Sequence, residues 1–275
     1  MALTEPLSEG IAAGPMVAKL TDPLGARLLE RTRVFRDRVK GSGGVIEDGY
    51  LENLFDPIYQ KVKDWGLESD LEFFGSASAV ENNSGSIPKI FDGSGNELDA
   101  VQNDSAKQPA LNKNGVGGHW EGSGDGTDDS WATANDIIIS EPITEIAVGT
   151  IPGDGDALIS GSQYSSTNGS ILIYNYENSN EWAVYSGLSV SGGSKDTNPH
   201  AFSAVFKGTD TLRVDKTQVL SGDAGSRDVE GFDIFTYDGN RHNSGVLLGA
   251  LVFSTELSPQ RQDKLASYLM DYYGI

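Results

Sequence analysis

The sequence contains no cysteine, which excludes disulfide bonds and thiolate metal sites. Its three histidines, His119, His200 and His242, do not have the spacing of a zinc site. No segment approaches the roughly 20 apolar residues that span a bilayer. The first 20 residues lack the basic start and apolar stretch of a signal peptide. We therefore expect neither a membrane partner nor export by a leader.

The usual catalytic signatures are also missing. The sequence has no G-x-S-x-G elbow, no P-loop and no G-x-G-x-x-G turn. One acidic run remains, Glu68, Asp70 and Glu72, whose alternation on a strand would put the carboxylates on one face, as glycoside hydrolysis requires. Ser69 separates the first two acids, however, and the run falls where a helical pattern ends. We interpret it as a solvated strand edge and predict a non-enzymatic protein with no catalytic residues.

Positive charge is scarce. The formal net charge is −20, divided as −3 over residues 1–70 and −17 over residues 71–275. Such an acidic surface repels phosphate backbones and anionic lipid, so we expect no nucleic acid partner. An acidic, solvated shell that keeps an abundant protein soluble is the simplest interpretation.

The sequence predicts an arm followed by helices in the N-terminal part. Residues 1–20 show no periodicity and predict an extended arm. A cap and first-turn pair, Asp22-Pro23, then opens an amphipathic helix that the glycines at 41–44 end. A second apolar face runs from Leu51 to Trp65, and Asp56-Pro57 is expected to divide it into two short helices. We predict an arm and helical anchoring unit over residues 1–70.

Beyond Gly66 the apolar period changes to two, and glycine, serine, asparagine and aspartate mark frequent turns. No strand alternates with a long helical pattern, which favours antiparallel pairing and a β-sandwich over residues 71–275. A helix from Ser258-Pro259 to Gly274, with Leu265, Leu269 and Tyr272 on one side, follows the last strand. The expected strands are residues 71–74, 89–92, 119–122, 136–139, 145–151, 157–160, 170–176, 181–186, 200–207, 211–214, 232–238 and 247–253.

This closing strand and helix resemble the end of a concanavalin A-like, laminin-G-type β-sandwich of tailed-phage virion structural proteins. The stretches at residues 90–111, 119–131 and 200–220 are similar to further parts of the same family. The resemblance implies a mainly β fold, a concanavalin A-like jelly-roll β-sandwich with a small N-terminal helical unit and a C-terminal helix. It also implies a protein of the virion, made in the host cytoplasm.

We therefore expect a non-enzymatic bacteriophage virion structural protein, a capsid decoration, head fibre or tail component that displays an acidic lectin-like domain. The alternative is a carbohydrate-binding adhesion module that binds host-surface glycans, and an endoglycosidase is a remote third. Other virion proteins would be bound through the N-terminal region, and the protein would be oligomeric on the particle. The expected anchor is the apolar set Leu54, Phe55, Ile58 and Trp65, and the alternative is that part of this surface packs on the sandwich.

Two groups of side chains are candidate binding residues. Oxygen ligands that suit calcium occur in the glycine-rich turn with Asp92, Ser94, Asn96 and Asp99, and in the acidic loop with Asp125, Asp128 and Asp129. Because such residues commonly cap their own turns, we expect no cofactor, with calcium the one candidate. Aromatic side chains could stack on sugars or fill the core. They are Trp120, Trp131, Trp182, Tyr164, Tyr174 and Tyr176.

Overall fold

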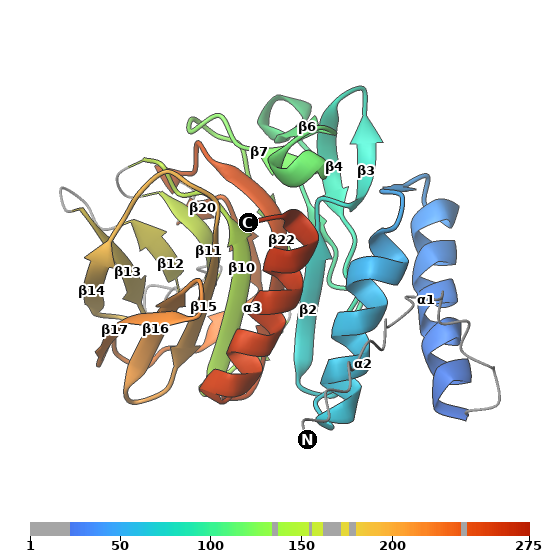
Figure 1. Cartoon of the computed structure of the whole chain (residues 1–275). Helices are drawn as coiled ribbons and strands as arrows, with labels where there is room; N and C mark the ends of the chain where they lie inside the picture. The colour runs from blue at the N-terminus through green and yellow to red at the C-terminus, as the bar shows by residue number, and fades with distance from the viewer. Residues whose placement is uncertain (1–22, 134–136, 154–155, 162–171, 176–179, 238–240) are drawn as a thin grey trace, which may run out of the picture.

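The computed structural model describes residues 23–133, 137–153, 156–161, 172–175, 180–237 and 241–275 (Figure 1). The arm predicted over residues 1–20 lies outside them. Within these ranges no helix is long and apolar enough to cross a membrane. Every strand pairing that the structure describes is antiparallel, and the mainly β fold predicted from the sequence is confirmed.

The strands form two layers. The layer nearer the viewer in Figure 1 is called the front sheet, and the opposite layer the back sheet. The front sheet has the order β17 (Thr217–Gly222), β16 (Asp210–Val214), β15 (His200–Phe206), β10 (Ile143–Gly149), β22 (Val246–Phe253) and β2 (Leu71–Ser76). The back sheet runs through β14 (Ser189–Ser194), β13 (Glu181–Tyr185), β12 (Leu172–Asn175), β11 (Ala157–Gly161), β19 (Phe232–Ile234), β8 (Trp131–Ala132), β5 (Ala100–Val101), β4 (Ser86–Ile90), β3 (Ala79–Asn83) and β1 (Val45–Ile46).

Two short strands connect the layers at one edge. β6 (Ala110–Asn112) pairs with β4, and β7 (Glu121–Ser123) pairs with both β6 and the start of β22. Two further two-stranded ladders complete the described strands, β9 (Ile138–Ile139) with β18 (Val229–Glu230) and β20 (Thr236–Tyr237) with β21 (Arg241–His242).

The space between the sheets is the main hydrophobic core. Phe202 and Phe206 of the front sheet meet Trp131, Trp182 and Phe232 of the back sheet there, and each of these side chains is buried. Alternation along the strands explains this, because every second residue of a strand points to the same face. On β10, Ile143 and Ala147 point inward while Ile146 and Val148 point to the outer face.

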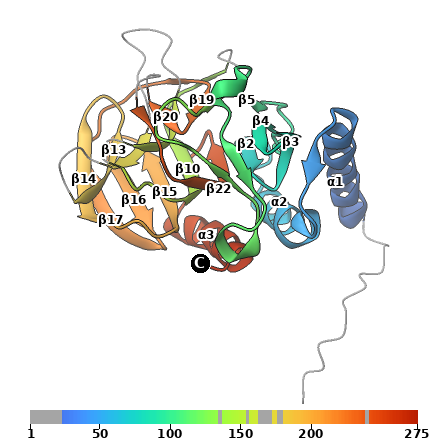
Figure 2. The same cartoon turned by 90° about the horizontal axis from the view of Figure 1, so that it is seen from above.

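Helices cover part of the outer face of the front sheet. They are the helical turn η1 (Leu51–Phe55), α2 (Asp56–Asp64) and α3 (Pro259–Tyr273), and α1 (Pro23–Gly41) lies beyond them, against α2, β1 and β3 (Figures 1 and 2). Together with the sheet they form a second hydrophobic cluster, in which Leu54, Phe55 and Ile58 are fully buried. These three residues therefore pack within the chain, which agrees with the alternative that part of the apolar set packs on the sandwich, and Trp65 is half-buried.

The terminal helix begins and ends where the sequence predicts. Ser258 is its N-cap, although its side chain makes no capping hydrogen bond, and Gly274 ends it in the left-handed conformation with φ of 70°. Leu265 and Leu269 are buried as predicted, but Tyr273 rather than Tyr272 completes the buried face. Leu265, Leu269 and Tyr273 lie on one side of the helix, and Tyr272 lies at the edge of that side.

Candidate functional site

The acidic run does not form a pair of carboxylates on one strand face. Only Glu72 lies on β2, because β2 begins at Leu71 and the two earlier acids lie in the preceding turn. The Tyr59 hydroxyl donates to Glu68 Oε1 at 2.6 Å, and the Ser254 hydroxyl donates to Glu72 Oε1 at 2.6 Å. The run thus holds α2 and the end of β22 in place.

The first calcium candidate is a structural turn. Asp92 is 1% exposed, and its carboxylate accepts hydrogen bonds from the amides of Phe74, Ser94 and Leu98 and from the Ser94 hydroxyl, at 2.6–3.1 Å. Asp99 pairs with Arg38 at 2.9 Å and accepts a hydrogen bond from the Asp92 amide. These carboxylates are therefore occupied by the turn and by α1, which leaves them unsuited to a cation.

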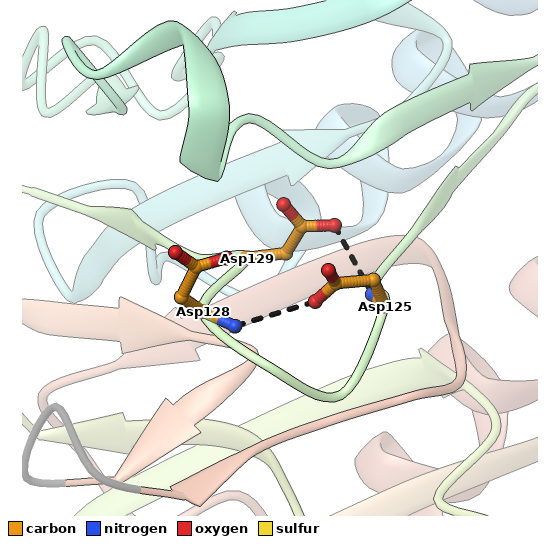
Figure 3. Close-up of side chains that lie close together, drawn as sticks. All are labelled: Asp125, Asp128 and Asp129. Carbon is orange, nitrogen blue, oxygen red and sulfur yellow. Dashed lines mark hydrogen bonds between the residues drawn. The ribbon is translucent and has the colours of Figure 1, made fainter.

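The second calcium candidate brings three carboxylates together. Asp125, Asp128 and Asp129 lie in the loop between β7 and β8, with ligand oxygens within 4.8 Å of one another (Figure 3). The same loop uses part of this oxygen set itself. Asp129 Oδ2 accepts from the Asp125 amide at 3.0 Å, and Asp125 Oδ1 accepts from the amides of Thr127 and Asp128 at 2.7 and 3.3 Å. The remaining oxygens are those that could hold a hard cation.

Burial and charge act in opposite directions on this loop. Burial, followed by the neighbouring Asp125 charge, raises the pKa of Asp129. The Thr127 amide lowers the pKa of the exposed Asp125 by stabilising its ionised form. The pKa values of Asp125 and Asp129 are therefore shifted in opposite directions, and backbone amides of the same loop already bond to oxygens of both carboxylates.

Two of the six candidate stacking residues are core residues. Trp131 and Trp182 are buried, and the Trp131 indole donates to the Ile87 carbonyl at 2.7 Å. Trp120 is half-buried, with the Lys113 ammonium 4.6 Å from its ring centre. The side chains of Tyr164, Tyr174 and Tyr176 lie outside the described part of the structure.

A cleft of about 440 Å³ lies between α1, α2 and the turn after β4. Its arginines are bonded within the chain: the Arg31 guanidinium donates to the Tyr59 hydroxyl at 2.6 Å and lies 4.4 Å from that ring centre. Arg38 is held by Asp99 and by the Asp92 carbonyl. The cleft was not foreseen from the sequence because its walls come from three separate segments.

Two histidines, His119 and His200, make hydrogen bonds with carboxylates. Glu47 is 8% exposed and lies 2.8 Å from His119 Nδ1, while its other oxygen accepts from the Ser78 hydroxyl at 2.6 Å. Hydrogen bonding to Asp215, at 2.6 Å, raises the pKa of His200. Glu47 and His119 are 72 residues apart, so no local pattern in the sequence predicts this pair.

No family model matches the chain, and no curated protein matches it in sequence. Solved structures do match it in fold. The sialidase of Trypanosoma rangeli in complex with the inhibitor DANA matches with a TM-score of 0.52 and 14% identity, over 83% of this chain and 40% of the sialidase. The chain thus spans less than half of that enzyme's length.

Two isolated domains match equally well. The binding domain of Paraclostridial Mosquitocidal Protein 1 has a TM-score of 0.53 and 13% identity, over 74% of this chain and 53% of that one. Domain 4 of AbnA, a GH43 extracellular arabinanase from Geobacillus stearothermophilus, in complex with arabinotriose, has a TM-score of 0.51 and 12% identity, over 72% of this chain and 98% of the domain. At these identities the likeness concerns the fold.

Proposed function

We propose that this chain is a non-catalytic carbohydrate-binding β-sandwich module. The observation that carries the proposal is the likeness to domain 4 of the arabinanase, which is nearly completely covered and is solved with arabinotriose. The sialidase, 40% of which is covered by the match, is also a protein solved with a sugar, sialic acid. The arabinanase domain in complex with its sugar supports glycan recognition, whereas the fold alone does not specify a function.

A non-catalytic role is supported by the acidic run, since Glu68 and Asp70 lie in a turn and only Glu72 lies on β2, and the Glu68 and Glu72 carboxylates are bonded to Tyr59 and Ser254. Most glycosidases use two carboxylates that face the same scissile bond. The prediction that the protein lacks enzyme activity is retained on this basis.

A glycan array probed with the full chain tests the proposal. We expect retention of the labelled protein on a restricted set of glycans, and no release of reducing sugar from those glycans on long incubation. If the chain binds no glycan on the array, the carbohydrate-binding function is overturned. Hydrolysis that disappears in Glu72→Gln would overturn the non-catalytic assignment.

A second candidate function is display on a bacteriophage virion, supported by the sequence resemblance of the closing strand and helix and by the −17 charge of residues 71–275. It is compatible with glycan binding, because an adhesion module can be part of a particle. Mass spectrometry of purified particles, with cryo-electron microscopy to locate the protein, tests this setting. Absence of the chain from particles made in cells that express it would contradict a virion role.

A further inference from the structure

A pocket of about 350 Å³ opens at the C-terminal end of α3. It is lined by Asn53, His119, Tyr268, Asp271 and Tyr272. These residues come from η1, from the segment that follows the short turn η3 (Val116–Gly118), and from α3. Three segments that are far apart in the sequence therefore build one small concave site.

Aromatic rings form one side of this pocket. Tyr268 and Tyr272 are four residues apart on α3 and so lie on the same helix face. The His119 ring lies against Tyr272, with centroids 4.1 Å apart and planes inclined by 37°. The Tyr272 hydroxyl is buried although the residue is partly exposed, so the pocket exposes its ring rather than its oxygen. Such ring faces suit the C–H surface of a sugar.

Polar groups form the rest of the lining. The Asn53 amide and the Asp271 carboxylate are exposed there. Glu47 takes the Nδ1 position of His119, which leaves Nε2 as the ring nitrogen available to a ligand. Glu47 is itself fixed by hydrogen bonds from the Ser78 hydroxyl and the Trp120 amide, at 2.6 and 3.2 Å. The orientation of the imidazole is thus set before any ligand arrives.

The backbone next to the pocket is closely packed. Gly117 has φ of 62°, and a β-carbon at this position would lie 2.1 Å from the Tyr273 carbonyl oxygen. Only glycine allows η3 to approach the end of α3 this closely. The two elements are therefore held together without a flexible gap, which favours a preformed site.

We propose that this pocket binds one residue of a neutral glycan, with the sugar stacked on Tyr268 and Tyr272 and hydrogen-bonded by Asn53, Asp271 and His119 Nε2. The assignment rests on the proposed carbohydrate-binding function and adds its location and ligand class. Neutral sugars are favoured over acidic ones because two carboxylates, those of Asp271 and Glu47, lie beside the rings against the one ammonium of Lys264 over the Tyr268 ring, in a chain of net charge −20. A sugar carboxylate would meet like charge there.

Ligand-observed NMR on the full chain tests the site with named probes: arabinotriose, maltotriose, mannobiose and lactose as neutral sugars, and sialyllactose as the acidic counterpart of lactose. We expect saturation transfer to at least one neutral probe and none to sialyllactose. Tyr268→Ala and Asn53→Ala should each weaken binding of that probe by about tenfold, since each removes one direct contact. Asn53 is exposed and Tyr268 is half-buried, so a thermal melt verifies that each variant is folded.

Tyr185→Ala is the matched control. Tyr185 lies on β13 of the back sheet and has the Arg227 guanidinium 5.4 Å from its ring centre, much as Tyr268 has the Lys264 ammonium at 4.8 Å. Binding that survives Tyr268→Ala or is lost in Tyr185→Ala overturns the pocket assignment and leaves glycan binding intact. Binding of sialyllactose alone, or of no probe in this panel, overturns the neutral-sugar site. Only failure on the whole glycan array removes the proposed function as well.

Discussion

The ring of Phe55 lies flat against the ring of Phe74, with centroids 5.3 Å apart and planes inclined by 8°. Phe35 of α1 stacks on the other side of Phe55 at 4.8 Å. One side chain of η1 thereby connects the first helix to β2 of the front sheet. The contact explains how the N-terminal helices pack on the outer face of the front sheet.

Phe55→Ala is expected to lower the free energy of unfolding by about 3–5 kcal/mol, because it removes a fully buried ring and leaves a cavity between two others. Urea denaturation measures the change. Val34→Ala on α1 is the control, since Val34 is 56% exposed and its truncation should cost less than about 0.5 kcal/mol. Equal effects for the two variants would contradict the stacked arrangement.

Removal of α3 should abolish cooperative folding. Leu265 and Leu269 are fully buried against the front sheet, and each burial contributes roughly 1.5–3 kcal/mol. The Tyr273 hydroxyl also donates to the Leu248 carbonyl at 2.8 Å. We expect a chain truncated after Leu257 to be insoluble or molten, as measured by near-UV circular dichroism and a melting curve. A truncated chain that melts as sharply as the full one would show that α3 is dispensable.

Glu145 makes stability depend on pH. It lies on β10, faces the space between the sheets, and neither carboxylate oxygen has a hydrogen-bond partner among the described residues. Its pairing neighbours on β15 and β22 are the apolar residues Ala204 and Val252. Burial raises the pKa of Glu145 to about 8 from an ordinary value of 4.5.

Between these two pH values the folded chain keeps a proton that the unfolded chain has released. Raising the pH through this interval should therefore lower the free energy of unfolding, by roughly 1 kcal/mol per pH unit from this group. Because His200 and several acids also titrate, the informative quantity is the difference between the original chain and Glu145→Gln, measured by urea denaturation at pH 6 and pH 8. A difference that does not change with pH would contradict a neutral buried Glu145.

Calcium is expected to have little effect on stability. In the loop of Figure 3, the amides of Asp125, Thr127 and Asp128 already occupy oxygens that a cation would need, and calcium requires about 6–8 oxygen ligands. Melting temperatures in calcium chloride and in a chelator should agree within about 1 °C. A calcium-dependent rise that disappears in Asp128→Asn would establish a metal site in this loop.

The parts of the fold that the sequence predicts are those with strong local patterns. The strands β10, β15 and β22 and the helix α3 are recognisable because long apolar runs or a clear helical period mark them. β14 and β17 were missed, since serine and glycine fill much of β14 and only Val219 and Leu220 give β17 an apolar character. Such strands owe their pairing to neighbours rather than to their own composition.

The candidate site shows the limit of local patterns more clearly. Asp92 has the sequence context of a calcium ligand, yet the same residue types also cap turns, and only the burial of its carboxylate distinguishes the two uses. Asn53, His119 and Tyr268 are unremarkable in the sequence. They line the proposed pocket only because η1, the segment after η3 and α3 lie side by side in the folded chain.

The central position of β22 in the front sheet affects how the chain can fold during synthesis. β22 lies between β2 and β10, and its Leu248 carbonyl accepts a hydrogen bond from Ser76, 172 residues earlier. A ribosome therefore releases both neighbours long before the strand that joins them. Since such distant pairings form slowly, the nascent chain must hold β2 and β10 with unpaired edges, and association with a chaperone would protect them in that interval.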